Sequence, residues 1–165
     1  MATLAPVGDS VDIGATEDAM IQVAAARAED EAAWRPVWQG YLDFYSQELA
    51  PDITELTFQR ALDPHEPVFL ALARKGDDII GFATYVLHRS TWARTHYLYL
   101  EDLFVTEAAR GTGAGRALVE HVIETGRQNG CARVYWVTHE TNAGARALYD
   151  KLADLPGLVS YFAKL

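Results

Sequence analysis

The chain contains one cysteine, Cys131, among 165 residues, so it cannot form an internal disulfide or a cysteine-based metal cluster. Its five histidines are scattered without the spacing of metal ligands, so no metal is expected. No apolar run approaches the roughly 18 residues of a membrane span, and no membrane partner is expected. The first basic residue is Arg27, so the beginning of the chain lacks the positively charged region of a secretory signal. We therefore expect a cytoplasmic protein.

Positive charge is scarce, because 14 Lys and Arg residues stand against 23 Asp and Glu, for a net charge of −9. This balance argues against a nucleic acid as a general partner. Residues 1–109 hold 18 acidic and 7 basic residues, whereas residues 110–165 hold 5 acidic and 7 basic ones. Either the surface is simply acidic, or the first part of the chain meets a cation and the second part meets an anion.

Half of the residues are apolar and 11% are aromatic, which is enough for the core of one ordinary domain. Residues 1–18 carry four acidic residues and no basic ones among scattered glycine, proline and serine. This composition predicts a flexible N-terminal arm. We expect residues 19–165 to form a single domain.

Hydrophobic periodicity predicts an order of elements along that domain. Strands are expected at 21–24, 68–73, 79–87, 95–105, 132–137 and 158–162, and helices at 28–49, 54–62, about 117–130 and from Asn142 onward. This order indicates a mixed α/β fold. The unit from 95 to 137 is expected to be a parallel, right-handed crossover.

A glycine-rich loop, Arg110-Gly111-Thr112-Gly113-Ala114-Gly115-Arg116, joins an expected strand to an expected helix. Glycines let the backbone approach a ligand, and the unpaired amides at a helix N-terminus attract an anion. Arg110 and Arg116 could pair with phosphate. The loop matches neither a Walker loop nor a dinucleotide fingerprint. It is either a phosphate-binding loop or a glycine-rich connection without a ligand.

Arg110, Gly113 and Gly115 resemble, in register, the R/Q-x-x-G-x-G/A motif that binds acetyl-CoA in the GNAT superfamily of N-acetyltransferases. Downstream, Asn142 followed seven residues later by Tyr149 resembles the second motif of that superfamily. The resemblance is good over about residues 97–152. It implies one domain with a central, mostly antiparallel sheet, a splayed parallel strand pair and flanking helices. Homodimers are common in the superfamily, so a homodimer is possible by analogy.

The resemblance also implies that acetyl-CoA is the co-substrate and which residues contact it. Its pantetheine arm would lie along the strand that ends with Leu103, Phe104 and Val105. Its pyrophosphate would lie on the amides of residues 111–116, which are Gly111, Thr112, Gly113, Ala114, Gly115 and Arg116, with Arg110 beside them. Asn142 and Tyr149 would complete the site, although Asn142 could also be a plain helix N-cap.

Acetyl transfer needs a neutral amine, and neutralising an alkylammonium of pKa about 10.4 at pH 7 costs about 4.6 kcal/mol. Glu101 and Asp102 are the candidate proton acceptors. Strand alternation would put them on opposite faces unless a bulge intervenes. Resemblance to diamine acetyltransferases favours Glu101 as the base and Asp102 as an amine contact. Either could instead form a strand-end ion pair, for instance Asp102 with Arg110.

By the same resemblance, Tyr149 would be the general acid that protonates the leaving thiolate, although it could instead be a core tyrosine. Residues around 137–151 are similar to a microbial subset that includes histone, polyamine and D-amino-acid acetyltransferases. Substrate contacts are expected from Trp92, Tyr41, His139 and Glu140. A small cationic amine such as a polyamine or an amino acid is the favoured acceptor. A protein lysine, an N-terminus or an aminoglycoside remain alternatives, as does a non-catalytic acyl-CoA sensor.

Overall fold

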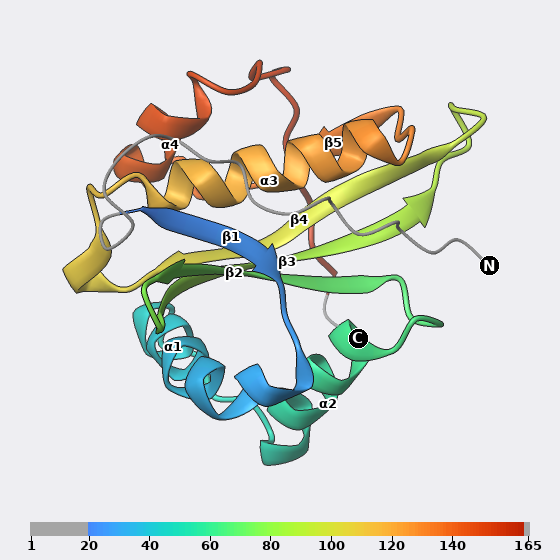
Figure 1. Ribbon diagram of the computed structural model, residues 1–165. Coiled ribbons are helices and arrows are strands. Elements are labelled where there is room, and N and C mark those ends of the chain that lie inside the picture. The colour runs from blue at the N-terminus through green and yellow to red at the C-terminus, as the bar shows by residue number, and fades with distance from the viewer. Residues whose placement is uncertain (1–19, 164–165) are drawn as a thin grey trace.

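The computed structural model describes residues 20–163 as a sheet with helices on both of its faces (Figure 1). The expected arm at 1–18 lies outside the described residues. The strands are β1 (Ile21–Ala25), β2 (Val68–Lys75), β3 (Asp78–Arg89), β4 (His96–Val105) and β5 (Arg133–Tyr135). The α-helices are α1 (Glu31–Phe44), α2 (Pro51–Leu62), α3 (Ala114–Gln128) and α4 (Ala143–Tyr149), and short 3-10 helices span Ala28–Asp30 and Glu107–Ala109. None of the helices described between residues 20 and 163 has the length and hydrophobicity of a transmembrane span.

The sheet has the order β1-β2-β3-β4-β5, antiparallel except for the last pair. This confirms the expected mixed α/β domain with a mostly antiparallel sheet. The parallel pairing of β4 with β5 ends at Tyr99 and Tyr135, while β4 itself continues to Val105. The two strands therefore separate beyond that point, which is the expected splay.

Two cores hold the layers together. On one face of the sheet, α3 buries Leu118, Val119 and Val122 against Leu98 and Leu100 of β4. On the other face, α1 and α2 bury an aromatic cluster against the sheet, with the members Trp34, Trp38, Phe58, Phe82 and Phe104. Figure 1 shows α3 on one side of the sheet and α1 and α2 on the other.

A β-bulge in β4 changes which residues face which helix. Thr84 of β3 pairs with Asp102, but the next residue of β3, Tyr85, pairs with Leu100, so Glu101 has no partner on β3. In a bulge two residues of one strand lie opposite a single residue of the other. Glu101 and Asp102 therefore both lie on the face of the sheet that α1 covers, where Asp102 bonds to Tyr41 and Glu101 lines a pocket with it. The bulge is the exception to strict alternation that the sequence left open, so the two carboxylates share a face instead of lying on opposite faces.

Several element ends differ from the sequence prediction. The helix expected at 28–49 is a 3-10 turn followed by α1, which ends at Phe44 because Ser46 adopts a positive φ of 51°. The helix expected at 54–62 begins earlier, because α2 starts at Pro51. Proline is well tolerated there because the first helical N–H has no acceptor within the helix.

The strand expected at 158–162 is absent from the structure, which has no regular element from Ala153 to Ala163. Leu158, Val159, Tyr161 and Phe162 are 75–91% exposed. The high β propensity of these residues does not produce a strand here, because that propensity reflects packing against neighbouring strands and no strand lies beside them. The prediction of a final strand is wrong for this reason.

Replacement of Gly81 by alanine should destabilise the sheet. A Cβ there would lie 2.6 Å from the carbonyl oxygen of Phe104, so β3 and β4 would have to move apart. We expect a loss of about 1–3 kcal/mol in the free energy of unfolding, measured by urea titration. Gly144→Ala in α4 is the matched control, because a Cβ there meets no atom within 4 Å. An unchanged midpoint for Gly81→Ala would contradict the packing described.

Candidate active site

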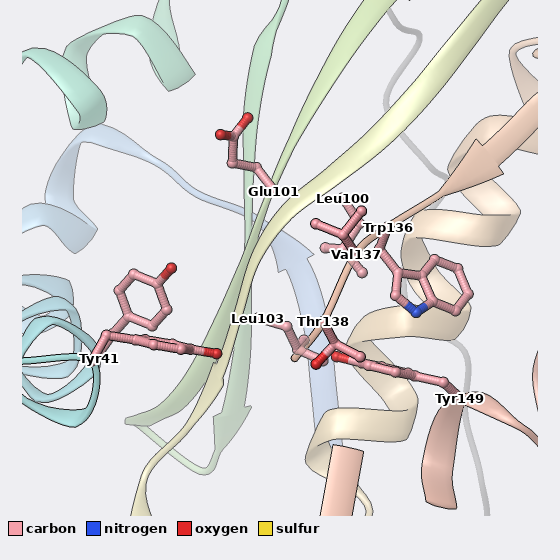
Figure 2. A pocket seen from close by; sticks show the side chains of 9 residues that line it. Tyr41, Leu100, Glu101, Leu103, Trp136, Val137, Thr138 and Tyr149 are labelled. Atoms are coloured by element: carbon pink, nitrogen blue, oxygen red, sulfur yellow. The ribbon is translucent and has the colours of Figure 1, made fainter. Parts of the chain in front are cut away.

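The separation of β4 and β5 opens a pocket that four elements line (Figure 2). Its lining comes from α1, β4, the segment after β5 and α4, with the residues Tyr41, Tyr45, Leu100, Glu101, Leu103, Trp136, Val137, Thr138 and Tyr149. In Figure 2 Tyr41 lies on one side of β4 and Tyr149 on the other. Residues from both halves of the chain therefore meet at the point where the sheet splits.

Asp102 connects α1 to the bulge through both of its carboxylate oxygens. Its Oδ1 accepts a hydrogen bond of 2.5 Å from the Tyr41 hydroxyl, and its Oδ2 accepts one from the Thr84 hydroxyl. The Asp102 amide donates to Thr84 Oγ1 at 3.2 Å. Asp102 is therefore occupied by two hydroxyls. Its alternative partner Arg110 lies instead over the Phe44 ring, 5.3 Å from the centroid.

Tyr41 and Glu101 have perturbed titration for related reasons. Burial raises the pKa of Tyr41 far above its usual range, and the Asp102 carboxylate raises it further, so the hydroxyl stays protonated. Burial raises the pKa of Glu101 as well, and repulsion by the neighbouring Asp102 carboxylate adds to it. Within residues 20–163 the Glu101 carboxylate has no hydrogen bond or ion pair, so it is the carboxylate available to a ligand.

Tyr149 reaches the pocket from α4. Asn142 is the N-cap of that helix, and its side-chain oxygen accepts from the Ala145 amide at 3.3 Å. The Tyr149 ring packs 5.3 Å from the ring of Trp136, centroid to centroid, and extends towards Thr138 (Figure 2). Burial raises the pKa of Tyr149 to about 12, so the phenol is a proton or hydrogen-bond donor at neutral pH.

The glycine loop begins α3 just beyond the end of β4. Gly111 and Gly113 have φ of 79° and 98°, which L side chains rarely adopt, and Gly113 is the N-cap of α3. The first amides of α3 lack acceptors within the helix and can bind an anion. Arg116 is paired with Glu120 at 3.1 Å on the exposed face of α3.

Some expected substrate residues lie outside the pocket. Trp92 is 87% exposed in the loop between β3 and β4. His139 and Glu140 are exposed between β5 and α4 and do not line the pocket. Sequence reasoning missed Thr84, whose only signal is a threonine among the mostly apolar residues from Ile79 to Leu87 of β3.

Comparison with known proteins gives a consistent result. Residues 29–153 match the family model described as the acetyltransferase (GNAT) family. The D-amino-acid N-acetyltransferase HPA3 of Saccharomyces cerevisiae is 39% identical over 143 residues, which cover 86% of this chain and 89% of the yeast protein. A thialysine N-epsilon-acetyltransferase of Bos taurus is 31% identical over 78 residues, or 47% of this chain and 45% of the bovine protein.

Among solved structures, AAC(6')-Iy in complex with the bisubstrate analogue CoA-S-monomethyl-acetylneamine has a TM-score of 0.76 to this chain. The identity is 17%, and the match covers 88% of this chain and 99% of that one. At this identity the likeness concerns the fold alone.

Removal of the Glu101 charge should stabilise the protein at neutral pH. A carboxyl group whose pKa is higher in the folded state than in the unfolded state lowers the stability of the fold when it is ionised. This loss of stability disappears below the pKa of the group in the unfolded chain, which is about 4.3 for glutamate. Glu101→Gln should therefore raise Tm at pH 7, and the gain should disappear as the pH falls to about 4.

The measurement is thermal unfolding of both proteins across this pH range. Glu48→Gln is the control, because Glu48 is an exposed carboxylate just after α1 and its replacement should leave Tm nearly unchanged. A Tm of Glu101→Gln at pH 7 equal to or below that of the unmodified protein would refute the interpretation.

Proposed function

The chain belongs to the acetyltransferase (GNAT) family, and on that premise we propose that it moves the acetyl group of acetyl-CoA to the primary amine of an amino acid. Two similar enzymes support this acceptor class, since their names specify D-amino acids and thialysine. The observation that carries the proposal is the free Glu101 carboxylate beside the opening between β4 and β5, with Tyr149 on the other side of β4.

Acetyl-CoA fits the opening and the glycine loop together. Family members use acetyl-CoA, and the residues present here suit its two polar parts. Beyond Tyr99 the edge of β4 has no strand beside it, so the backbone from Leu103 to Val105 can bond the amide groups of pantetheine. The amides of residues 111–116, in the glycine loop and the first turn of α3, suit the pyrophosphate.

Glu101 is the base in this proposal, and Asp102 is a positioning residue. Both oxygens of Asp102 already accept hydroxyl hydrogen bonds, whereas Glu101 is unpaired within the described chain. The raised pKa of Glu101 makes it a stronger proton acceptor than an ordinary glutamate. It takes a proton from the ammonium group of the acceptor, directly or through water.

The transfer itself then balances in two steps. The lone pair of the neutral amine attacks the carbonyl carbon of the thioester, and a C–N bond forms. The C–S bond breaks, and the thiolate of CoA takes the proton of the Tyr149 hydroxyl. Glu101 has by then passed its first proton to water, so it takes the surplus amine proton and releases that to water as well. Tyr149 regains a proton from water, and one proton is released in the whole reaction. Tyr149 is protonated at neutral pH, because burial raises its pKa to about 12.

Gly113→Ala should weaken the binding of acetyl-CoA. A side chain at a φ of 98° costs about 1–2 kcal/mol of strain, which the start of α3 would relieve by moving its amides. We expect the Kd of acetyl-CoA, measured by calorimetry, to increase at least about fivefold.

Gly76→Ala is the matched control, since Gly76 has a φ of 58° in the turn between β2 and β3, away from the loop. It should lose stability similarly and leave the Kd unchanged. An unaltered Kd for both variants would argue against the loop as the pyrophosphate site.

The acceptor class is tested by CoA thiol release with a panel of D- and L-amino acids, polyamines, an aminoglycoside and a lysine peptide. Turnover concentrated on amino acids supports the proposal, and turnover concentrated on another class overturns it. Tyr149→Phe should lower kcat by about 100-fold, because it removes the proton donor, and should change the Kd of acetyl-CoA far less. A kcat close to that of the unmodified enzyme would exclude Tyr149 as the acid.

A further inference from the structure

Four aromatic side chains form a second feature on the face of the sheet that carries Glu101. Tyr97 and Tyr99 of β4, Tyr135 of β5 and His88 of β3 are neighbours by strand register, since His88 pairs with Tyr97 and Tyr99 with Tyr135. We call these four residues the tyrosine patch. The residues that alternate with them, such as Leu98, pack on the opposite face against α3. The core under α1 and α2 is formed by residues at the other end of β3 and β4, such as Phe82 and Phe104.

The patch is half-buried, and its rings are held by mutual contacts. The rings of Tyr99 and Tyr135 lie 4.9 Å apart at 35°, and those of Tyr97 and Tyr135 lie 6.3 Å apart at 74°. His88 Nδ1 lies 2.9 Å from the carbonyl oxygen of Arg89, which can only accept, so Nδ1 carries the proton. In the neutral imidazole of His88, Nε2 then accepts a hydrogen bond from the Tyr135 hydroxyl at 2.9 Å. This bond fixes the orientation of the Tyr135 ring.

Opposite charges stand at the two ends of the patch. Glu101 follows Tyr99 on β4, at the pocket end. Arg133 pairs in register with Tyr97 at the far end, and its guanidinium lies over the Tyr97 ring, 4.6 Å from the centroid. Within residues 20–163 Arg133 has no ion pair. Tyr135 lies between the two charges and responds to both, because Glu101 raises its pKa and Arg133 lowers it, while burial raises it most.

The spacing of these charges restricts what can bridge them. Arg133 lies level with Tyr97, four residues before Glu101 on the same strand. At a rise of about 3.3 Å per residue the two backbone positions are at most about 13 Å apart along the sheet, and the bulge at Glu101 shortens this slightly. In an α-amino acid the amine and the carboxylate share one carbon, so such a molecule cannot reach both charges through its α-amine. A polyamine spans the distance but has no anion for Arg133.

We propose that the tyrosine patch is the subsite for the acceptor, in which Arg133 pairs with a carboxylate while the reacting amine lies at Glu101. The acceptor is then an amino acid of the lysine type, whose side-chain amine is separated from the carboxylate by an aliphatic chain. The methylene groups of that chain pack on the faces of Tyr99 and Tyr135. This inference rests on the proposed function and specifies its substrate and its specificity-determining residue, Arg133.

Lysine itself makes a sharp probe, because it offers both amines in one molecule. The subsite predicts that the acetylated product is the side-chain amide, identified by NMR. It also predicts a lower KM for lysine than for cadaverine, which is lysine without its carboxylate. A product acetylated at the α-amine, or equal KM values for lysine and cadaverine, would overturn the subsite.

The proposed role of Arg133 in binding the carboxylate of the acceptor is tested by Arg133→Gln. Loss of one exposed charge pair should raise the KM for lysine about fivefold, with little change for cadaverine or in kcat. Arg127→Gln is the matched control, because Arg127 pairs with Glu124 on α3, on the opposite face of the sheet. An equal effect of Arg133→Gln on lysine and cadaverine would show a structural role and refute carboxylate recognition.

The outcomes separate the two proposals. Turnover of α-amines of amino acids, with no dependence on Arg133, would leave the proposed function standing and remove the subsite. Turnover confined to another acceptor class, or to no acceptor at all, would remove both.

Discussion

The hydrogen bonds of Asp102 are the interaction on which the arrangement of the site depends. A bulge turns this carboxylate towards α1, where the hydroxyls of Tyr41 and Thr84 occupy both of its oxygens. A half-buried charge is costly unless it is hydrogen-bonded, and two hydroxyl donors meet that requirement. They also determine the neighbouring chemistry, because the fixed negative charge of Asp102 makes Glu101 harder to ionise. One structural carboxylate thus raises the pKa of its neighbour, which favours Glu101 as the proton acceptor of the proposed reaction.

The opening between β4 and β5 leaves space for a ligand beside Glu101 and Asp102. The parallel pairing stops after three residue pairs, so one edge of β4 is available where the strand approaches the glycine loop. The helices on the two faces of the sheet supply different parts of the site. Tyr41 comes from α1 on one face, and Tyr149 from α4 beyond the opening. The split in the sheet is where groups from the two layers can reach a common ligand.

The sequence predicts some of these features well, because they are local. The spacing of the glycines in the Arg110–Arg116 loop demands a particular backbone, and Gly111 and Gly113 do adopt positive φ. The faces of Glu101 and Asp102 were not predictable, since the bulge arises from pairing with a strand some twenty residues away in sequence. For the same reason Thr84 gave no functional signal, and residues 158–162 looked like a strand although none lies beside them.

The helix that carries Tyr149 has a consequence for the dynamics of the site. α4 has seven residues, Ala143–Tyr149, and none of them is fully buried. Helices this short are not stable alone, so α4 depends on its Asn142 cap and on the packing of Tyr149 against Trp136. Its local opening therefore requires less free energy than global unfolding, in which the β3–β4 ladder must break. Tyr149 is the proton donor of the proposed reaction, so openings of α4 that leave the sheet and both cores intact would make the catalytically competent population smaller than the folded one.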